Sequence, residues 1–563
     1  PGPWAIEGYS NPGEFVSQRC QMDSLTAAHQ ALMWYITGNE QYRRNVFAIL
    51  DNFALVESAV DHTDFRFGDV VYNLCFAAEI LRYTECDNEE LQWTQEDTDK
   101  LTGFMDIVHK FYDATWFWMN QHSFTVLGMM GESIFTNDAV MYGKAVERTL
   151  VNTEGEHGGR NGSVKYQIRK VEKNDLTGEL LKEPNIQLME MGRDQGHAYG
   201  NLGGLSELVA SIYAQGTLVD PEEGTISTAA NAVNPFEFQD DRLLAGASYL
   251  AKYHLGYEVT WVPADSGVSS SSPNGIYKSI NGYPWKGNLS NYYGIVYNYY
   301  KYIAKADMSQ EKYRYVADAY ESIMPEGASG DFIGLSTLMF TPEAAAADGI
   351  SRKKDFSGDT ETISQTEYFS ALRRGTAQVM KEGDVTFVRA DAAGAGTEFV
   401  IHHFGYPRKG LAALKVRSNG DARIRLGCQE ADHDPAAVFE VHNTGGKWQT
   451  VYYDLSKSEN TAASMVYYTI TGNATQVDMD YLEFDPAQAA PQIQEIHHEN
   501  DVLSQTLKDG AVKQYVAVGG KYQTKVVLSD AVEGVIYGVQ GLPENASFDK
   551  AKGTLQWTPS AGQ

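Results

Sequence analysis

Apolar residues recur at helical spacing through the first 345 residues of the chain. The stretch from Leu25 to Leu50 is the clearest case, with a break expected at Gly38-Asn39. The same period returns in segments 70–83, 101–111, 139–150, 202–214, 242–253, 292–304 and 312–323. Because this pattern contains no alternating strands, it favours an all-α fold, an (α/α) toroid built from successive helical hairpins.

The pattern changes near residue 380. Short runs rich in β-branched and aromatic residues, separated by turn residues, extend from VTFVRAD (385–391) to QVDMDYLEF (476–484) and predict a β-sandwich. The segment 485–492 (DPAQAAPQ) has the composition of a linker. Strand signals beyond it, YVAVGGKYQTKVVLS and VIYGVQGLP, predict a second, smaller β-sandwich that is cut short at Gln563.

The sequence therefore predicts a multidomain protein, with an all-α toroid followed by two all-β sandwich domains. The expected boundaries are 1–375, 376–487 and 488–563. Residues 345–380 are polar and lack an apolar period, so we expect a linker or a loop packed on the helical domain.

Composition excludes several classes of protein. Hydrophobic residues make up 43% and charged residues 21% of the 563 residues, which excludes disorder as the main state. The 45 Lys and Arg against 74 Asp and Glu give a net charge of −29, which argues against nucleic acid as a partner. No run approaches the roughly 18–20 apolar residues that span a membrane. Aromatic residues at 12% favour carbohydrate handling, because their rings stack on sugars.

Cysteine usage and the first residues give little direction. The four cysteines lack CxxC spacing and are too few for a disulfide scaffold, which leaves a Cys75–Cys86 pair open. The chain opens with PGPWAIEGYS rather than a basic and then apolar leader, so no signal peptide is visible. A chain that begins without Met is compatible with removal of such a leader.

Two short segments in the helical part concentrate polar side chains. In WFWMNQHSF (116–124), Asn120, Gln121 and His122 stand among aromatic residues; a loop would let them point into one pocket, whereas a helix would separate them. The alternative is a helix end, with Asn120 capping and His122 in the core. In MEMGRDQGHAY (189–199), glycines bracket Arg193, and His197 follows; the alternative here is an Arg–Asp pair that ties a loop.

Two further segments have an unusual composition. On the predicted helix YYGIVYNYY, Tyr293, Tyr297 and Tyr300 fall on one face. This face is interpreted as part of the core, as a sugar-stacking surface or as a set of catalytic groups. Segment 160–173 carries five basic residues against one acid in a strongly acidic chain. It is interpreted either as the wall of an anion-binding cleft or as a solvated face. No nucleophile elbow, HExxH zinc motif, P-loop or dinucleotide fingerprint is present.

The ordered set of NQH (120–122), GRDQGH (192–197) and YNYY (297–300) resembles the alginate-lyase-like superfamily, and polysaccharide lyase family 38 most of all. The resemblance covers about residues 15–340 and includes DDRLLAGASYLAKYHLG. It implies an (α/α) toroid with a cleft that acts on β-1,4-linked polyuronates such as mannuronan (alginate) or glucuronan. It also implies Asn120, His197 and Tyr297 as catalytic residues.

In the reaction that this resemblance implies, Asn120 neutralises the uronate carboxylate and Tyr297 acts as base and then as acid in β-elimination. His197 either supports Tyr297 or neutralises the carboxylate. Gln121, His122, Arg193, Tyr293 and Tyr300 are expected to bind substrate. No cofactor or metal is required for catalysis, and none is evident from ligand spacing. The family's arginine shortly before the catalytic tyrosine is absent from GNLSNYYGIVY; only Lys286 stands upstream.

The region 384–486 resembles carbohydrate-binding modules of the family 6 type, and the tail resembles Ig-like domains of secreted bacterial proteins through GLPENASFDKAKGTLQWTP. Family 6 modules often hold structural calcium through acids near both ends. Arg389 and Asp391 depart from the usual glutamate pair, so calcium is not predicted. Together these modules imply a secreted, periplasmic or cell-surface protein.

The expected function is therefore a polyuronate lyase whose partner is an acidic polysaccharide. Two alternatives stay open. One is a glycoside hydrolase on an acidic polysaccharide, which would use a pair of the many available carboxylates. The other is a non-catalytic polysaccharide-binding protein that uses the toroid as a cleft.

Overall fold

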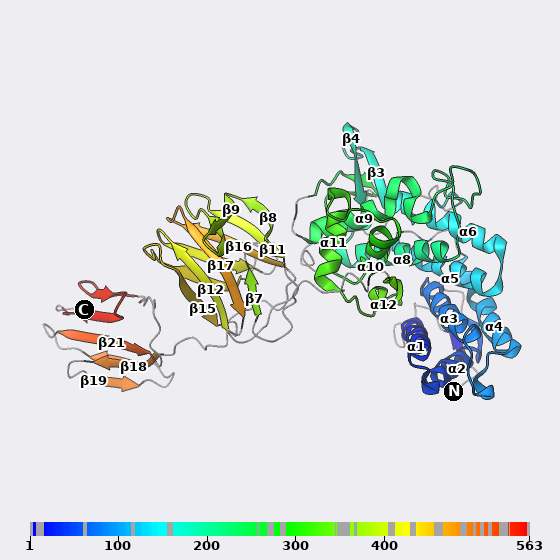
Figure 1. Cartoon of the computed structure of the whole chain (residues 1–563), viewed down its shortest axis with the longest axis horizontal. Helices are drawn as coiled ribbons and strands as arrows, with labels where there is room; N and C mark the ends of the chain where they lie inside the picture. The colour runs from blue at the N-terminus through cyan, green and yellow to red at the C-terminus, as the bar shows by residue number, and fades with distance from the viewer. Residues whose placement is uncertain are drawn as a thin grey trace. The chain divides into compact units, whose positions relative to one another are not determined.

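The computed structural model divides the chain into two compact units, Pro1–Asp355 and Phe356–Gln563 (Figure 1). It describes residues 4–6, 16–59, 65–113, 117, 119–154, 162–255, 257, 259–266, 275–281, 289–343, 345, 361–364, 369–402, 411–427, 435–454, 465–484, 493–498, 503–506, 512–515, 521–528, 539 and 541–559. No helix among these residues is long and apolar enough to cross a membrane.

The first unit is mainly helical. Its α-helices are α1 (Val16–Thr37), α2 (Glu40–Phe53), α3 (Arg66–Arg82), α4 (Gln95–Tyr112), α5 (Asn120–Thr136), α6 (Ala139–Leu150), α7 (Val164–Gln167), α8 (Gln195–Ala214), α9 (Phe238–His254), α10 (Gly294–Asn298), α11 (Glu311–Ile323) and α12 (Ser336–Phe340). Short 3-10 turns are η1 (Glu89–Leu91), η3 (Met189–Gly192) and η4 (Pro235–Glu237), and η5 (Tyr299–Ile303) is a π-helical turn.

Short strands accompany these helices in pairs. They are β1 (Trp4–Ile6) with β2 (Val56–Ala59), β3 (Ile168–Lys173) with β4 (Leu180–Leu188), and β5 (Ala264–Asp265) with β6 (Ile276–Tyr277). The β3–β4 hairpin stands out from the helices in Figure 1. The sequence pattern predicted neither this hairpin nor helix α5. The helical character of the unit is confirmed, and closure of its helices into a toroid stays a prediction.

The predicted break at Gly38-Asn39 separates α1 from α2. Gly38 adopts a φ of 64°, which a residue without Cβ reaches at little cost, and its N–H bonds back to the carbonyl of Trp34. The Asn39 side chain then accepts the N–H of Gln41 and caps α2. Local chemistry therefore sets the start and the end of these two helices.

Helices α3 and α5 pack closely through glycines. A Cβ added at Gly68 would lie 1.9 Å from the carbonyl oxygen of Phe124, and one at Gly128 would lie 2.7 Å from the Cα of Gly68. Because both obstacles are backbone atoms, they cannot rotate away. This contact fixes the position of α5, whose first residue is Asn120.

Gly68→Ala should therefore destabilise the helical unit, by about 1–3 kcal/mol or more, because the helices must move apart to admit the methyl group. Gly103→Ala is the matched control. Gly103 is exposed inside α4 with nothing within 4 Å of an added Cβ, so this change should stabilise the unit by about 0.5–1 kcal/mol. Urea unfolding followed by helical circular dichroism measures both. Equal effects of the two substitutions would contradict the packing described here.

The second unit contains two facing antiparallel sheets. One has the order β15-β12-β17-β10-β9, with β7 also paired to β17, and the other has the order β14-β13-β16-β11-β8. The strands are β7 (Glu361–Ser364), β8 (Phe369–Arg374), β9 (Ala377–Glu382), β10 (Val385–Ala390), β11 (Thr397–His402), β12 (Leu411–Ser418), β13 (Ala422–Gly427), β14 (Pro435–Val441), β15 (Gln449–Asp454), β16 (Met465–Gly472) and β17 (Val477–Phe484).

Strand alternation forms the core of this sandwich. On β12, Leu414 and Val416 are fully buried in the apolar cluster, whereas Lys415 and Arg417 alternate with them on the other face. Phe399 and Tyr468 stack across β11 and β16 with ring centroids 5.0 Å apart. The predicted β-sandwich is present.

The sandwich begins earlier than the sequence pattern indicated. The unit boundary lies at 355/356 rather than 375/376, because β7 pairs with β17 and β8 pairs with β11. Within the described residues, β7, β8 and β9 thus form strands at the edges of the sandwich where a linker or packed loop was expected. Their polar composition misled the prediction, since edge strands with one solvated face carry few apolar residues.

Beyond the sandwich, a four-stranded sheet has the order β18-β21-β23-β22, and β19 pairs with β20. These strands are β18 (Ile493–His498), β19 (Leu503–Thr506), β20 (Val512–Tyr515), β21 (Tyr522–Leu528), β22 (Ser547–Asp549) and β23 (Thr554–Trp557). Strand β21 lies within the predicted KYQTKVVLS run, and the expected linker 485–492 lies outside the described residues. A separate third domain from 488 stays a prediction.

Candidate functional site

The GRDQGH segment begins helix α8 and orients His197. Asp194 caps the helix: its Oδ1 accepts the backbone N–H of His197 at 2.8 Å, and its Oδ2 accepts the ring Nδ1–H at 2.6 Å. Burial raises the pKa of the Asp194 carboxyl, but the hydrogen bonds from His197 outweigh it and hold that pKa below its usual value.

This dyad is open to solvent. The side chain of His197 is 40% exposed, and its second ring nitrogen, Nε2, has no hydrogen-bond partner among the described residues. An imidazole held through Nδ1 by a carboxylate presents Nε2 as a proton acceptor. The arrangement can therefore carry acid–base chemistry.

Asn120 and Arg193 meet beside the start of α8. The Nη1 of Arg193 donates to the Oδ1 of Asn120 at 3.4 Å, and the backbone N–H of Asn120 donates to the Oε1 of Glu190 at 2.9 Å. A Cβ added at Gly200, one turn after His197, would lie 3.8 Å from the Nδ2 of Asn120. The amide thus lies along the same face of α8 as the imidazole.

The buried carboxylate of Glu190 contacts both Asn120 and Arg193. Its side chain is fully buried, and burial raises the pKa of its carboxyl, opposed by the Asn120 N–H and by Arg193, whose Nη1 lies 3.9 Å from Oε1. Sequence reasoning quoted Glu190 within MEMGRDQGH but gave it no role. Its position directly before the polar cluster was the available signal.

Asp331 also belongs to the surroundings of His197. Burial raises the pKa of the Asp331 carboxyl, and the charges of Arg66 and of His197 oppose that shift, so this carboxyl lies within electrostatic reach of each of the two groups. Sequence reasoning missed Arg66 and Asp331, because neither stands in a motif. Arg66 is a cation within electrostatic reach of Asp331, in a chain that lacks the expected arginine before Tyr297.

His122 lies in the core. It is 2% exposed, its Nε2–H donates to the carbonyl of Arg148 at 2.9 Å, and burial lowers its pKa to about 4. Because α5 begins at Asn120, the helix separates His122 from Asn120 and places His122 in the core, as in the alternative interpretation. Asn120 does not cap the helix, because the N-cap residue is Met119. The buried ring is not placed to contact substrate as expected. Gln121, between them, is half-buried.

Tyr297 has its own polar partners. It is 3% exposed, its hydroxyl donates to the Oε1 of Glu321 at 3.0 Å, and it accepts from the Nζ of Lys301 at 2.8 Å. Burial and then the charge of Glu321 raise the pKa of the phenol. A buried phenol that donates to a carboxylate stays protonated, so it is poorly suited to take up a proton as a general base.

Tyr293 and Tyr300 are fully buried and separate from each other. The hydroxyl of Tyr293 lies 3.1 Å from that of Tyr199, and the hydroxyl of Tyr300 donates to the Phe236 carbonyl at 2.8 Å and to Asp241. The π-helical turn η5 follows α10 and shifts the helical phase after Asn298. The three predicted tyrosines therefore have three different sets of partners.

The structure thus brings together Asn120, Arg193 and His197. It does not join Tyr297, Tyr293 or Tyr300 to their hydrogen-bond network, and it buries His122. Within the described part of the chain, no group of three or more His, Cys, Asp or Glu side chains is arranged to hold a metal ion. Cys75 and Cys86, left open as a pair, are both free and buried.

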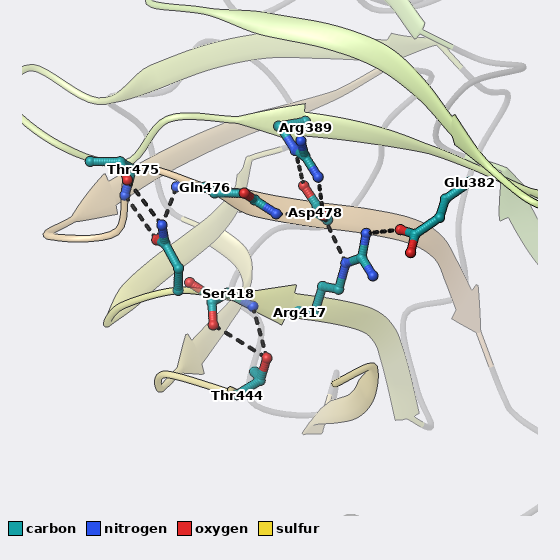
Figure 2. A network of polar contacts seen from close by, with 9 residues as sticks. Glu382, Arg389, Arg417, Ser418, Thr444, Thr475, Gln476 and Asp478 are labelled. Carbon is teal, nitrogen blue, oxygen red and sulfur yellow. Dashed lines mark hydrogen bonds and ion pairs between the residues drawn. The ribbon is translucent and has the colours of Figure 1, made fainter. Parts of the chain in front are cut away.

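A second polar network lies on the sandwich (Figure 2). Asp478 of β17 accepts two hydrogen bonds from Arg389, one from Nε at 2.6 Å and one from Nη2 at 2.8 Å. It accepts a third from the Nε of Arg417 at 2.8 Å. Arg417 also pairs with Glu382. Two guanidinium groups thus neutralise the buried Asp478, whereas calcium binding of the family 6 type would require carboxylates. The guanidinium groups of Arg389 and Arg417 are cations without ligand oxygens, so this set of side chains does not fit a calcium ion.

Comparisons with known proteins give limited information. No protein-family model matches the chain, and no curated protein matches it. Among solved structures, CsCBM6-3 from Clostridium stercorarium in complex with cellobiose matches at a TM-score of 0.19 and 13% identity, over 23% of this chain and 94% of that one.

Two further solved structures match at the same TM-score of 0.19. The C-terminal CBM6 of a laminarinase from Zobellia galactanivorans is 19% identical over 22% of this chain and 98% of that one. A glycoside hydrolase family 43 arabinoxylan arabinofuranohydrolase from Bacillus subtilis is 16% identical over 24% of this chain and 29% of that one. TM-scores this low carry no argument, so the description of the sandwich rests on its own strand pairing.

Proposed function

We propose that the helical unit is a polysaccharide lyase that cleaves a β-1,4-linked polyuronate, such as mannuronan or glucuronan, by β-elimination. The observation that carries the proposal is the open Asp194–His197 dyad next to the Asn120–Arg193 pair. One pair offers a proton acceptor, and the other offers N–H donors for a carboxylate. A uronate presents both requirements on one sugar ring.

The chemistry of the substrate explains this combination. The C5 proton of a uronate is α to a carboxylate and too weakly acidic to leave unaided. Hydrogen bonds from the Asn120 amide and the Arg193 guanidinium stabilise the negative charge that develops on that carboxylate as the proton leaves.

His197 is the proton-transferring residue in this proposal. Its Nε2 takes the proton from C5, the C4–O4 bond breaks, and the imidazolium returns the proton to O4 of the departing chain. The products are a new non-reducing end with a 4,5 double bond and an intact hydroxyl on the leaving saccharide. Asp194 stabilises the imidazolium between the two transfers. In β-linked mannuronate and glucuronate, C5–H and O4 lie on one side of the ring, so one residue serves both steps.

This assignment differs from the role that the sequence resemblance implied for Tyr297. The buried phenol with a raised pKa and the Glu321 and Lys301 partners favour a structural role for that residue. For the second unit, we propose polysaccharide binding, based on the sandwich fold and the resemblance of 384–486 to carbohydrate-binding modules. Such modules also favour an extracytoplasmic location.

The test follows the product. Incubation with mannuronan, glucuronan and hyaluronan should produce the ultraviolet absorbance of an unsaturated uronate with at least one of the first two polymers. New reducing ends without absorbance would mean hydrolysis, and a glycoside hydrolase would replace the proposal. Binding without any product from these polymers would leave a non-catalytic polysaccharide-binding protein.

A further inference from the structure

The basic segment singled out in the sequence lines a separate pocket of the helical unit. The pocket has a volume of about 900 Å³, and its cations come from α7, β3 and α9: Lys165, Arg169, Lys170 and Arg242. None of its lining residues belongs to the cluster around His197. This volume is within the range of binding sites for small organic molecules.

Arg242 is built into the pocket wall. It is 8% exposed, and its Nη1 donates to the carbonyl of Ile168 at 3.0 Å. Its Nε has no hydrogen-bond partner among the described residues. A buried guanidinium that keeps an unpaired donor costs stability, and a ligand anion at the wall it lines would compensate its charge.

The backbone before Arg242 is held in an unusual conformation. Gln239, Asp240 and Asp241 have φ values of 48°, 58° and 62°, a left-handed run that side chains other than glycine rarely adopt. Asp241 is anchored by the Tyr300 hydroxyl at 3.0 Å and by the Nζ of Lys312 at 2.6 Å. These contacts hold the run that directs the chain into Arg242.

Arg169 is also fixed by the protein. Its Nε donates to the carbonyl of Tyr166 at 3.2 Å, and its Nη1 donates to the carbonyl of Asp265. Lys170 lies 3.9 Å from Glu172 at the exposed side. Lys165 has a nitrogen 5.9 Å from the centre of the Tyr166 ring and no carboxylate partner within the described residues. The charges of Glu222 and Asp240 act on Arg242, whose Nε nevertheless has no hydrogen-bond partner among the described residues, and Lys165 has no ion pair there.

The remaining lining groups narrow the class of ligand. Glu172, Glu222 and Asp240 supply acceptors for hydroxyl groups, and Tyr166 and Pro221 supply apolar surface for C–H groups. An inorganic anion alone would leave the acceptors unused, and a neutral sugar would leave the cations unused. A ligand with an oxyanion, several hydroxyls and a C–H face satisfies all three.

We propose that this pocket is a second binding site of the helical unit that takes an acidic sugar residue, with its carboxylate or sulfate ester against Lys165, Lys170 and Arg242. The proposal rests on the pocket alone and does not depend on the lyase activity. It would let the unit hold a polyanionic chain at two places, which raises the effective concentration of the chain at each.

The experiment separates this site from the His197 cluster. Calorimetric titration with a β-1,4-glucuronate trisaccharide is carried out on an Asn120→Ala/Arg193→Gln background, in which the His197 cluster is disabled; any binding by the sandwich unit is common to all the variants compared, so the differences between them report on the pocket. Adding Lys165→Gln/Lys170→Gln should weaken the remaining binding at least ~10-fold, the usual scale for losing charge-assisted hydrogen bonds. Lys182→Gln, an exposed lysine of the same hairpin outside the pocket, should change binding less than about twofold.

Further arms use a sulfated trisaccharide, inorganic sulfate and cellotriose. Weaker binding of inorganic sulfate and loss of cellotriose binding support an acidic sugar, and the two acidic trisaccharides separate carboxylate from sulfate ester as the anion. The proposal fails if the background does not bind either acidic trisaccharide, if the double lysine variant binds as well as its parent, or if cellotriose binds equally well. Arg242→Gln adds a third test where its melting temperature shows that it folds.

Discussion

His197→Ala should lower the rate of uronan cleavage by about 10²–10⁴-fold, the range for losing acid–base catalysis, while substrate binding is largely kept. The imidazole is the exposed member of the dyad, and the Asn120–Arg193 donors that bind the carboxylate remain in place. The effect should therefore fall on kcat rather than on KM. The measurement is the initial rate of unsaturated-uronate absorbance with the most active polymer.

Asp194→Asn is the companion variant. It keeps the shape of the helix cap but cannot stabilise an imidazolium, so kcat should fall and the acid limb of its pH profile should move relative to the parent protein. A purely structural role of Asp194 would lower the amount of folded protein without moving the profile.

Tyr297→Phe distinguishes the two assignments of the proton-transferring residue. With the hydroxyl held between Glu321 and Lys301, we expect a rate within a few fold of the parent and a lower melting temperature. If Tyr297→Phe is inactive and His197→Ala retains activity, the role that the resemblance implied is right and the structural argument for His197 is wrong. Normal rates for both variants would show that neither residue transfers the proton.

The sequence predicted those features that depend on local chemistry. The break at Gly38-Asn39 appears where expected, because a glycine with positive φ and an asparagine cap are local signals. Arg193 and His197 stand out because the GRDQGH segment is a dense polar run, whereas the role of Asn120 came from the family resemblance. The β-sandwich followed from strand alternation.

Features that depend on tertiary contacts were missed. Whether Asn120 and His122 share a pocket depends on the helix α5, which packs through Phe124 and Gly128 against the distant Gly68. Asp331 lies within electrostatic reach of both His197 and Arg66, which stand far from it in the chain, without any motif. Strands β7 and β8 pair with β17 and β11, and their polar residues gave no strand signal. Pairing across long sequence separations leaves little trace in local pattern.

The Arg389–Asp478–Arg417 network should be the most sensitive polar feature of the sandwich. The Asp478 side chain is 0% exposed, accepts both Nε and Nη2 of Arg389, and also accepts Arg417 and the Nε2 of Gln476 at 3.1 Å (Figure 2). The Arg417 guanidinium lies 4.7 Å from the Trp448 ring centre and 5.0 Å from that of Phe387. It is thus held against aromatic rings as well as the carboxylate.

Asp478→Asn should destabilise the sandwich by about 3–5 kcal/mol, because it leaves two guanidinium groups without their shared anion and turns an acceptor into a donor. Glu382→Gln is the control: its side chain is 64% exposed and contacts only the rim of the network, so about 1 kcal/mol or less is expected. Hydrogen exchange of the β12 and β17 backbone N–H groups, measured on the full chain, isolates the sandwich from the helical unit.

The effect of Asp478→Asn should depend on pH in a defined direction. Burial raises the pKa of Asp478, but the hydrogen bonds from Arg389 and Arg417 outweigh it and lower that pKa below 3.8. A carboxyl whose pKa is lower in the folded state stabilises the fold above its unfolded pKa, and this stability is lost as the pH falls through the folded value. The difference in stability of the sandwich between the parent protein and Asp478→Asn should therefore have its full size at pH 7 and become smaller below about pH 4. A difference in exchange that stays constant from pH 7 down to pH 3 would show that packing of the side chain, and not its charge, stabilises this part of the sandwich.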